Sequence, residues 1–164
     1  MAGKDKDLVD LFHEQLKDIY YAERRLLKAL PKMARAAGSD RLSEAFLTHR
    51  DQTEVHVERL ERVFDLLGRP ARGKKCPAID GILEEGEEAM ETFRDSPALD
   101  AGLIGDAQAV EHYEIARYGT LRQWAEQLGM REAADLLDRT LAEEGETDHL
   151  LTMIAEREVN RHAA

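Results

Sequence analysis

Four long stretches of the chain carry apolar residues at alternating steps of four and three, which is the spacing of one buried face of an α-helix. Between the first two stretches, Gly38 gives a helix-ending signal and Ser39 a helix-starting signal. Gly129 ends the third stretch in the same way. The pattern therefore predicts long helices over about 6–37, 40–67, 98–128 and 131–158.

A connection of roughly thirty residues separates the second long helix from the third. Gly68 and Pro70 stop the second helix, and a shorter helix is predicted over about 79–93. The connection is too long for a tight turn between antiparallel neighbours, but it suits a crossover along the length of a bundle. We expect one all-α domain over residues 1–164, a four-helix bundle whose long crossover contains a short extra helix.

Each predicted apolar row is interrupted by polar residues near its middle. These residues are Glu23 in the first row, His49, Thr53 and His56 in the second, Glu111 and Glu114 in the third, and Glu144 and Asp148 in the fourth. Carboxylates buried without a partner cost several kcal/mol each and repel one another. Either positive charge therefore balances them, or some of them are protonated.

Two sources of positive charge are open at this point. His49 and His56 could be protonated partners of the carboxylates, or they could be neutral ligands of one or two divalent metal ions. The acids outnumber these imidazoles, which favours metal. Carboxylate oxygen and imidazole nitrogen together suit Fe, Mn or Zn, whereas the absence of a thiolate in the rows argues against iron–sulfur clusters.

Composition excludes several other functions. A formal net charge of -11 and a pI near 5.0 argue against nucleic-acid binding, which needs clustered Lys and Arg. A single cysteine, Cys76, excludes an internal disulfide, and no apolar run approaches the ~20 residues of a membrane-spanning helix. The N-terminal segment MAGKDKDLVD has no apolar core of a secretory signal, so we expect a cytoplasmic protein.

The two halves of the chain form a weak internal repeat. Superposing Gly38 on Gly129, an offset of 91 residues, places Glu23 opposite Glu114. With two more residues in the second turn, Thr53 lies opposite Glu146 and His56 opposite His149. Glu146 and His149 share one helix face beside the central row, so they compete with Glu144 and Asp148 as ligands of the fourth helix.

Several segments, in order, resemble the YciE/YciF family of ferritin-like proteins over almost the whole chain. They are DLFHEQLKDIYYAERRLLKALPKMARAAGS, HRDQTEVHVERLERVFDLLG, VEHYEIARYGTLRQWAEQLG and LAEEGETDHLL. The resemblance implies a ferritin-like bundle, a homodimer and a role in stress responses. The wider superfamily, with rubrerythrins and bacterioferritins, typically holds a di-iron or di-manganese centre, with a Glu from each of two helices and a Glu-x-x-His pair from each of the other two.

Carried onto this sequence, the resemblance implies Glu23 and Glu114, with Glu111 beside it, as ligands of the first and third long helices. The second helix departs from the pattern, because it has Thr53 where the superfamily has Glu, with His49 one heptad before His56. We expect a divalent metal, with Fe or Mn favoured over Zn. The expected ligands are Glu23, His49, His56, Glu111, Glu114, Glu144 and Asp148.

Such a centre would oxidise Fe(II) or remove peroxide, with dioxygen or peroxide as the small-molecule partner and Tyr118 tuning the site. The alternative is a metal-free helical interaction module of a stress response, in which the buried polar groups set helix register and dimer geometry.

Overall fold

The computed structural model describes residues 5–164, so the first four residues of the N-terminal segment lie outside it. The helices are α1 Leu8–Ala36, α2 Asp40–Leu67, α3 Pro77–Thr92, α4 Leu99–Gln127, α5 Arg131–Ile154, a π-helical turn over Ala155–Val159, and α6 Asn160–Ala163. Residues 5–164 contain no β-strand. The all-α fold is confirmed, and each predicted helix boundary lies within a few residues of an observed one. No helix among the described residues is long and apolar enough to cross a membrane.

Local sequence signals fix the helix ends. The Asp7 side chain accepts from the Asp10 backbone N–H while the Asp10 side chain accepts from that of Asp7, which caps α1. Ser39 accepts from the Leu42 N–H and starts α2. Gly68 and Gly129 end their helices at φ 69 and 72, in the left-handed region where a side chain would strain the backbone.

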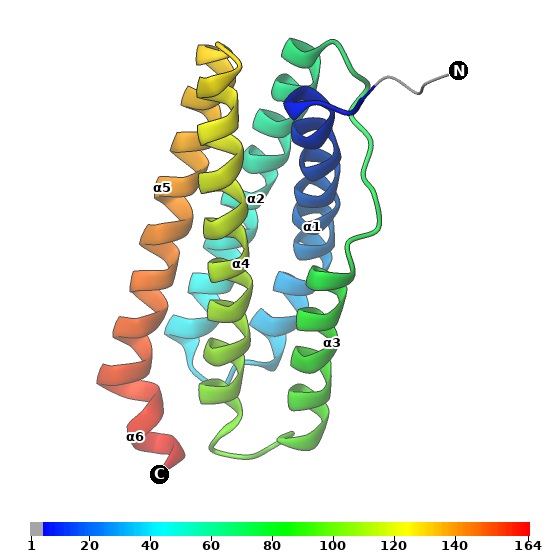
Figure 1. Ribbon diagram of the computed structural model, residues 1–164. Helices are drawn as coiled ribbons and strands as arrows, with labels where there is room; N and C mark the ends of the chain where they lie inside the picture. Colours follow the sequence, from blue (N-terminus) through cyan, green and yellow to red (C-terminus); the bar gives the residue numbers. More distant parts are fainter. Residues whose placement is uncertain (1–4) are drawn as a thin grey trace.

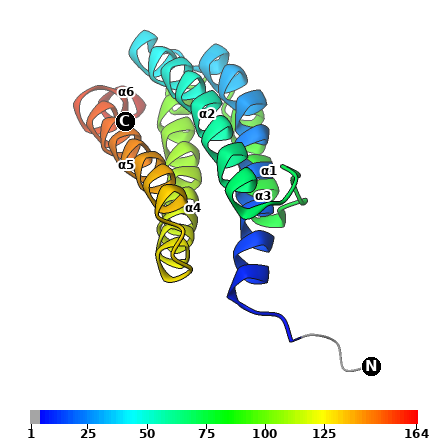
Figure 2. The ribbon, with the colours of Figure 1, turned by 90° about the horizontal axis from the view of Figure 1, so that it is seen from above.

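The four long helices lie side by side (Figure 1). The pairs in contact are α1 with α2, α4 with α5, α2 with α5, and α1 with α4, so the helices enclose one common interior (Figures 1 and 2). The long connection runs along the outside of α1, where the Lys74 N–H donates to the Lys17 carbonyl. The helix α3 then packs against α4 and α1. The predicted crossover with its extra helix has this arrangement.

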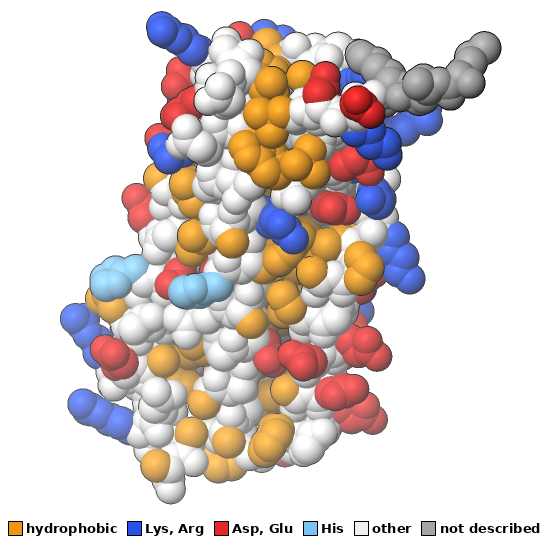
Figure 3. Space-filling model, in the orientation of Figure 1, with side chains coloured by type: hydrophobic (Ala, Val, Ile, Leu, Met, Phe, Trp, Pro, Cys, Tyr) orange, Lys and Arg blue, Asp and Glu red, His pale blue; other side chains and the backbone are white. Residues whose placement is uncertain are grey.

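Apolar side chains fill both ends of the interior, and polar side chains occupy its middle. Phe12, Leu16 and Phe64 are fully buried toward one end, and Leu42 and Phe46 toward the other. On the face shown in Figure 3, acidic and basic side chains are interspersed around a band of hydrophobic ones. The buried polar layer is therefore enclosed along the bundle axis by apolar packing.

Candidate metal centre

The polar layer is built from one or two side chains of each long helix. Glu23 comes from α1, His49 and His56 from α2, Glu111 and Glu114 from α4, and Glu144 from α5, and none is more than 3% exposed. His49 and His56 are seven residues apart, about two helical turns, so both imidazoles lie on the inner face of α2. Glu111 and Glu114 are three apart and share the inner face of α4. Helical periodicity thus places these side chains on the inner faces of their helices, and the packing of the four helices brings them together.

These side chains form two groups that meet at one residue. The first group is His49, Glu111, Glu114 and Glu144, and the second is Glu23, His56 and Glu144. Within each group, one potential ligand atom per residue lies within 4.8 Å of the others. Glu144 belongs to both groups, with Oε2 toward His49 and Oε1 toward His56, so it could contribute a ligand atom to each of two cations.

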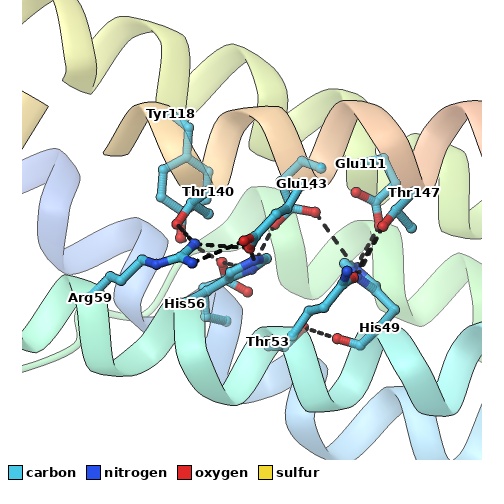
Figure 4. Close-up of polar contacts among 12 residues, drawn as sticks. His49, Thr53, His56, Arg59, Glu111, Tyr118, Thr140, Glu143 and Thr147 are labelled. Carbon is cyan, nitrogen blue, oxygen red and sulfur yellow. Dashed lines mark hydrogen bonds and ion pairs between the residues drawn. The ribbon is translucent and has the colours of Figure 1, made fainter. Parts of the chain in front are cut away.

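In the first group, His49 provides the nitrogen. Its Nε2 atom lies 2.7 Å from Oε1 of Glu111 and 3.6 Å from Oε2 of Glu144. Its other nitrogen, Nδ1, lies 3.4 Å from the side-chain oxygen of Gln52. The imidazole therefore turns Nε2 toward the carboxylates (Figure 4).

In the second group, His56 lies between two carboxylates of different helices. Its Nδ1 atom is 3.0 Å from Oε1 of Glu144 and 3.3 Å from Oε1 of Glu23. The buried Tyr118 hydroxyl donates to the same Oε1 atom of Glu23. Tyr118 thus holds Glu23 from α4 and leaves its second oxygen facing the interior.

The far side of His56 is held by an ion pair at the edge of the bundle. Nε2 of His56 donates to Oε2 of Glu143 at 2.8 Å. Arg59 binds both oxygens of Glu143, at 2.8 and 2.9 Å, and also donates to Thr140 (Figure 4). A carboxylate on one imidazole nitrogen commonly orients the other nitrogen toward a metal. Glu143 therefore directs Nδ1 of His56 into the centre.

Burial and mutual repulsion govern the protonation of the carboxylates. Burial raises the pKa of Glu114 and Glu144 well above the ordinary value, and neighbouring carboxylates add to the effect. Burial also raises the pKa of Glu111, to about 7. Without a metal, Glu111 would therefore take up a proton near neutral pH, and Glu114 and Glu144 would hold protons to higher pH than an ordinary carboxyl.

His56 and Glu23 behave oppositely because they are paired. Burial acts to lower the pKa of His56, but its contacts with Glu144 and Glu23 raise it to about 11. Burial acts to raise the pKa of Glu23, but His56 and Tyr118 bring it below the ordinary value. The imidazolium of His56 thus balances the carboxylate of Glu23. The other three carboxylates of the centre become neutral by taking up protons.

Many donor atoms of the centre lack a hydrogen-bond partner among residues 5–164. These buried atoms are Oε2 of Glu23, Oε2 of Glu111, both oxygens of Glu114, both oxygens of Glu144, Nε2 of His49 and Nδ1 of His56. The two nitrogens are close to carboxylates but are not aligned for a hydrogen bond. Buried polar atoms are ordinarily paired, so this cluster of converging oxygen and nitrogen donors fits cations such as Fe, Mn or Zn.

Six of the seven residues expected as ligands converge in this way, and Asp148 does not. Its side chain is 22% exposed, accepts from the Gln108 amide and lies 3.2 Å from Nε2 of His112. It follows Glu144 by one turn, and the Gln108 side chain of α4 holds it at the edge of the bundle. Glu146 and His149 are exposed as well. Of the α5 residues considered as ligands, Glu144 is thus the one that lies in the buried groups.

The observed centre corrects the alignment of the two halves. A uniform offset of 91 residues, without the two extra residues, places Thr53 opposite Glu144 and His56 opposite Thr147. Thr53 is fully buried, and its hydroxyl donates to the His49 carbonyl at 2.8 Å. Each half therefore supplies one member of the Glu-x-x-His pair, Glu144 from α5 and His56 from α2, and His49 supplies the second imidazole.

Sequence reasoning gave no role to Glu143 and Arg59, although both carry a signal. Arg59 follows His56 by three residues and so lies over the same face of α2. Glu143 directly precedes Glu144, so the two side chains leave the axis of α5 in neighbouring directions. Which neighbour each would meet depends on the packing of α2 against α5.

Comparisons with known proteins show the family to which the chain belongs. Residues 7–164 match the family described as a domain of unknown function, DUF892. Protein YciF of Escherichia coli is 45% identical over 159 residues, covering 96% of each chain.

Solved structures give the same relationship. The E. coli stress protein YciF has a TM-score of 0.91 and 44% identity, covering 96% of this chain and 99% of that one. YcfI of Rhodopseudomonas palustris has a TM-score of 0.89 and 42% identity, covering 94% and 99%. A protein of Xanthomonas campestris, 22% identical with a TM-score of 0.74 over 94% of both chains, shares the fold. The chain therefore belongs to the DUF892 family together with YciF, as its resemblance to YciE/YciF proteins predicts.

Proposed function

We propose that this protein binds two divalent metal ions, iron or manganese, between its four long helices and acts in a stress response. The observation that carries the proposal is the set of buried, unpartnered donor atoms that converge in two groups sharing Glu144. Its relative in E. coli is a stress protein, which supports the physiological setting.

The charge of the centre favours two ions over one. Glu23, Glu111, Glu114 and Glu144 together carry four negative charges when ionised. Two divalent cations balance these charges while both imidazoles stay neutral as ligands. One divalent cation leaves two buried negative charges that only protons could remove. The donors are oxygen and nitrogen, which suits iron and manganese.

Two such redox-active ions, when bound, would supply electrons for the reduction of dioxygen or peroxide, and we propose oxidation of Fe(II) or disposal of peroxide as the reaction. The residues of the chain prepare the site for this chemistry. Tyr118 holds Glu23, Glu143 holds His56, and apolar packing at both ends limits water.

One observation favours the alternative of a metal-free interaction module. The raised pKa values of Glu111, Glu114 and Glu144 would let protons neutralise the centre, and His56 could remain an imidazolium between Glu23 and Glu144. In that case the polar layer would fix helix register rather than bind a ligand. The two functions differ in metal content and in their response to a chelator.

The deciding experiment is elemental analysis of protein purified without chelator, beside the double variant Glu23→Ala with Glu144→Ala. The proposal expects close to two ions per chain in the parent and loss of both in the variant. Glu146→Ala is the control, because it removes an exposed carboxylate of the same helix. Metal below about 0.2 per chain in the parent, with thermal stability unchanged by chelator, supports the metal-free module instead.

The proposal includes a homodimer, as the family resemblance implies. Leu47 and Val55 on α2 and Leu150 on α5 are exposed, and these two helices are neighbours. Exposed apolar side chains on adjacent helices suit contact with a second copy. Sedimentation velocity should give the mass of two chains, and Leu150→Arg should shift the protein toward one.

A further inference from the structure

A cavity of about 40 Å³ lies between α1, α3 and α4. Apolar side chains such as Ile82, Leu83 and Leu103 form most of its wall, and Arg25, Lys28 and Lys32 also border it. Met33 and Val110 form another part of the wall. No residue of the metal centre borders this outer cavity.

A second cavity of about 10 Å³, here called the inner cavity because it reaches the metal centre, shares Met33 and Val110 with the first. Its wall is otherwise mainly apolar, with Leu26, Leu30, Phe46, Ala107 and Leu151. At one end it reaches His49, Glu111 and Thr147. The inner cavity is therefore lined by apolar side chains along most of its wall and by two candidate metal ligands, His49 and Glu111, at one end.

The inner cavity is poorly suited to water. A buried water typically makes about three hydrogen bonds and needs roughly 10–15 Å³. At the polar end, Nε2 of His49 faces Glu111 at 2.7 Å, and Nδ1 lies 3.4 Å from Gln52 and 3.5 Å from the Thr147 hydroxyl. Nε2 of His49 and Oε2 of Glu111 have no hydrogen-bond partner of their own in the described part of the chain, so this end offers a water about two partners rather than three. An ion would lose its hydration without replacement. A small, neutral, apolar molecule fits the mainly apolar lining.

We propose that the two cavities form an access path and binding site for dioxygen, which ends at the His49–Glu111 side of the metal centre. Of the two residues that line both cavities, Met33 is the movable one, since its side chain has three rotatable bonds, whereas Val110 is stiff. The use of dioxygen rests on the proposed function, but the binding of the gas does not require metal.

The first test uses metal-free protein with labelled methyl groups. Dissolved dioxygen is paramagnetic and speeds the NMR relaxation of nearby methyl protons, so spectra under oxygen are compared with spectra under argon. We expect a larger enhancement at Met33, Val110 and Leu30, which are 3–6% exposed, than at Leu60 and Val63, which are 0% exposed and border neither cavity. Equal enhancement at all five residues, or an ordered water in the inner cavity, would overturn the proposal.

The second test fills the inner cavity by Ala107→Leu. Ala107 borders only the inner space and is 5% exposed. The enhancement at Leu26 and Leu30 should be lost, while that at Ile82 and Met90 of the outer cavity should remain. Ala134→Leu, at another 5% exposed alanine away from both cavities, is the matched control and should retain the whole pattern.

A third measurement links the path to the centre. With Fe(II) loaded to the same stoichiometry, Ala107→Leu should slow oxidation by dioxygen relative to Ala134→Leu. Unchanged oxidation kinetics would remove the path from the reaction. If the parent binds no metal, the proposed function fails, whereas the relaxation measurements still decide whether the cavities hold dioxygen.

Discussion

His56 and Glu143 meet across the α2–α5 contact, with Nε2 of the imidazole 2.8 Å from Oε2 of the carboxylate. The next residue of the chain, Glu144, lies 3.0 Å from the other nitrogen of the same ring. Two consecutive glutamates thus hold one imidazole, one from outside the centre and one from within. The half-buried Glu143 is also paired with Arg59, so its charge is retained at the bundle edge.

Replacing Glu143 by Ala should weaken metal binding without removing a ligand. The imidazole would lose the acceptor that directs Nδ1 inward, and the loss of such a partner typically lowers metal affinity about 10–100-fold. Titration of metal-free protein with Mn(II) or Co(II) measures the change. Glu143→Gln, which keeps an acceptor oxygen, should recover much of the affinity.

The control for this prediction is Glu132→Ala. Glu132 pairs with Arg62 across the same two helices, but this pair is exposed and distant in sequence from the ligands. Its removal should leave metal affinity unchanged. If both variants weaken binding equally, the effect belongs to the α2–α5 contact in general rather than to the orientation of His56.

The sharing of Glu144 between the two groups predicts different stoichiometries for two single variants. Glu144→Ala should abolish or strongly weaken both sites, because each loses a carboxylate. Glu23→Ala removes a ligand of the His56 group alone and should leave the His49 group able to bind one ion. Calorimetric titration distinguishes the two results, and equal stoichiometry in both variants would refute the bridging arrangement.

The sequence predicts which side chains point into the bundle, because this depends on the period of one helix. It does not predict which partner a side chain meets when that partner lies on a second helix. Glu23, His49 and His56 interrupt apolar rows, so their inward direction follows from the period of 3.6 residues. Asp148 continues the same row along α5, but the amide of Gln108 from α4 holds it at the edge. The partner of Glu143 depends on the packing of α2 against α5, which periodicity does not contain.

The repeat shows the same limit. A uniform offset of 91 residues relates Thr53 to Glu144, but these two residues differ in type, so the relation is hard to see in the sequence. The Glu146-x-x-His149 motif instead suggested an alignment shifted by two residues. Exposure of Glu146 and His149 removes that alternative. The hydrophobic periodicity and the turn glycines are enough to predict the helices. Which candidate ligands come from each half of the chain can be seen only in the three-dimensional structure.

The metal-free protein should lose stability as the pH rises. The pKa of Glu111 is raised from 4.5 to about 7 and that of His56 from 6.5 to about 11. Both groups hold protons more tightly when folded, so their contribution is complete below the unfolded pKa and is lost as the pH passes the folded pKa. For Glu111 alone, the loss between about pH 4.5 and pH 7 is on the order of 3 kcal/mol.

Denaturant unfolding of chelator-treated protein at several pH values measures this dependence. Glu111→Gln should flatten the curve between about pH 4.5 and pH 7, because the amide cannot titrate. Metal affinity should rise over the same interval, since the ligands must release protons to bind a cation. The lowered pKa of Glu23 acts in the opposite direction, and its contribution is lost only in more acidic solution. Stability of the metal-free protein that increases from pH 5 toward pH 9 would contradict the assignment.

Thr53 provides the last prediction, because it stands where the superfamily pattern has a carboxylate ligand. Its hydroxyl already donates to the His49 carbonyl at 2.8 Å, one turn back along α2. Thr53→Val keeps the shape and removes this local bond, so the free energy of unfolding should fall by only about 1 kcal/mol. Metal stoichiometry and affinity should be unchanged. Elemental analysis of the Val variant beside an equally folded parent checks this prediction. Loss of an ion in the variant would show that Thr53 is a ligand, so that position 53 would contribute to the metal centre as the carboxylate does in the superfamily pattern.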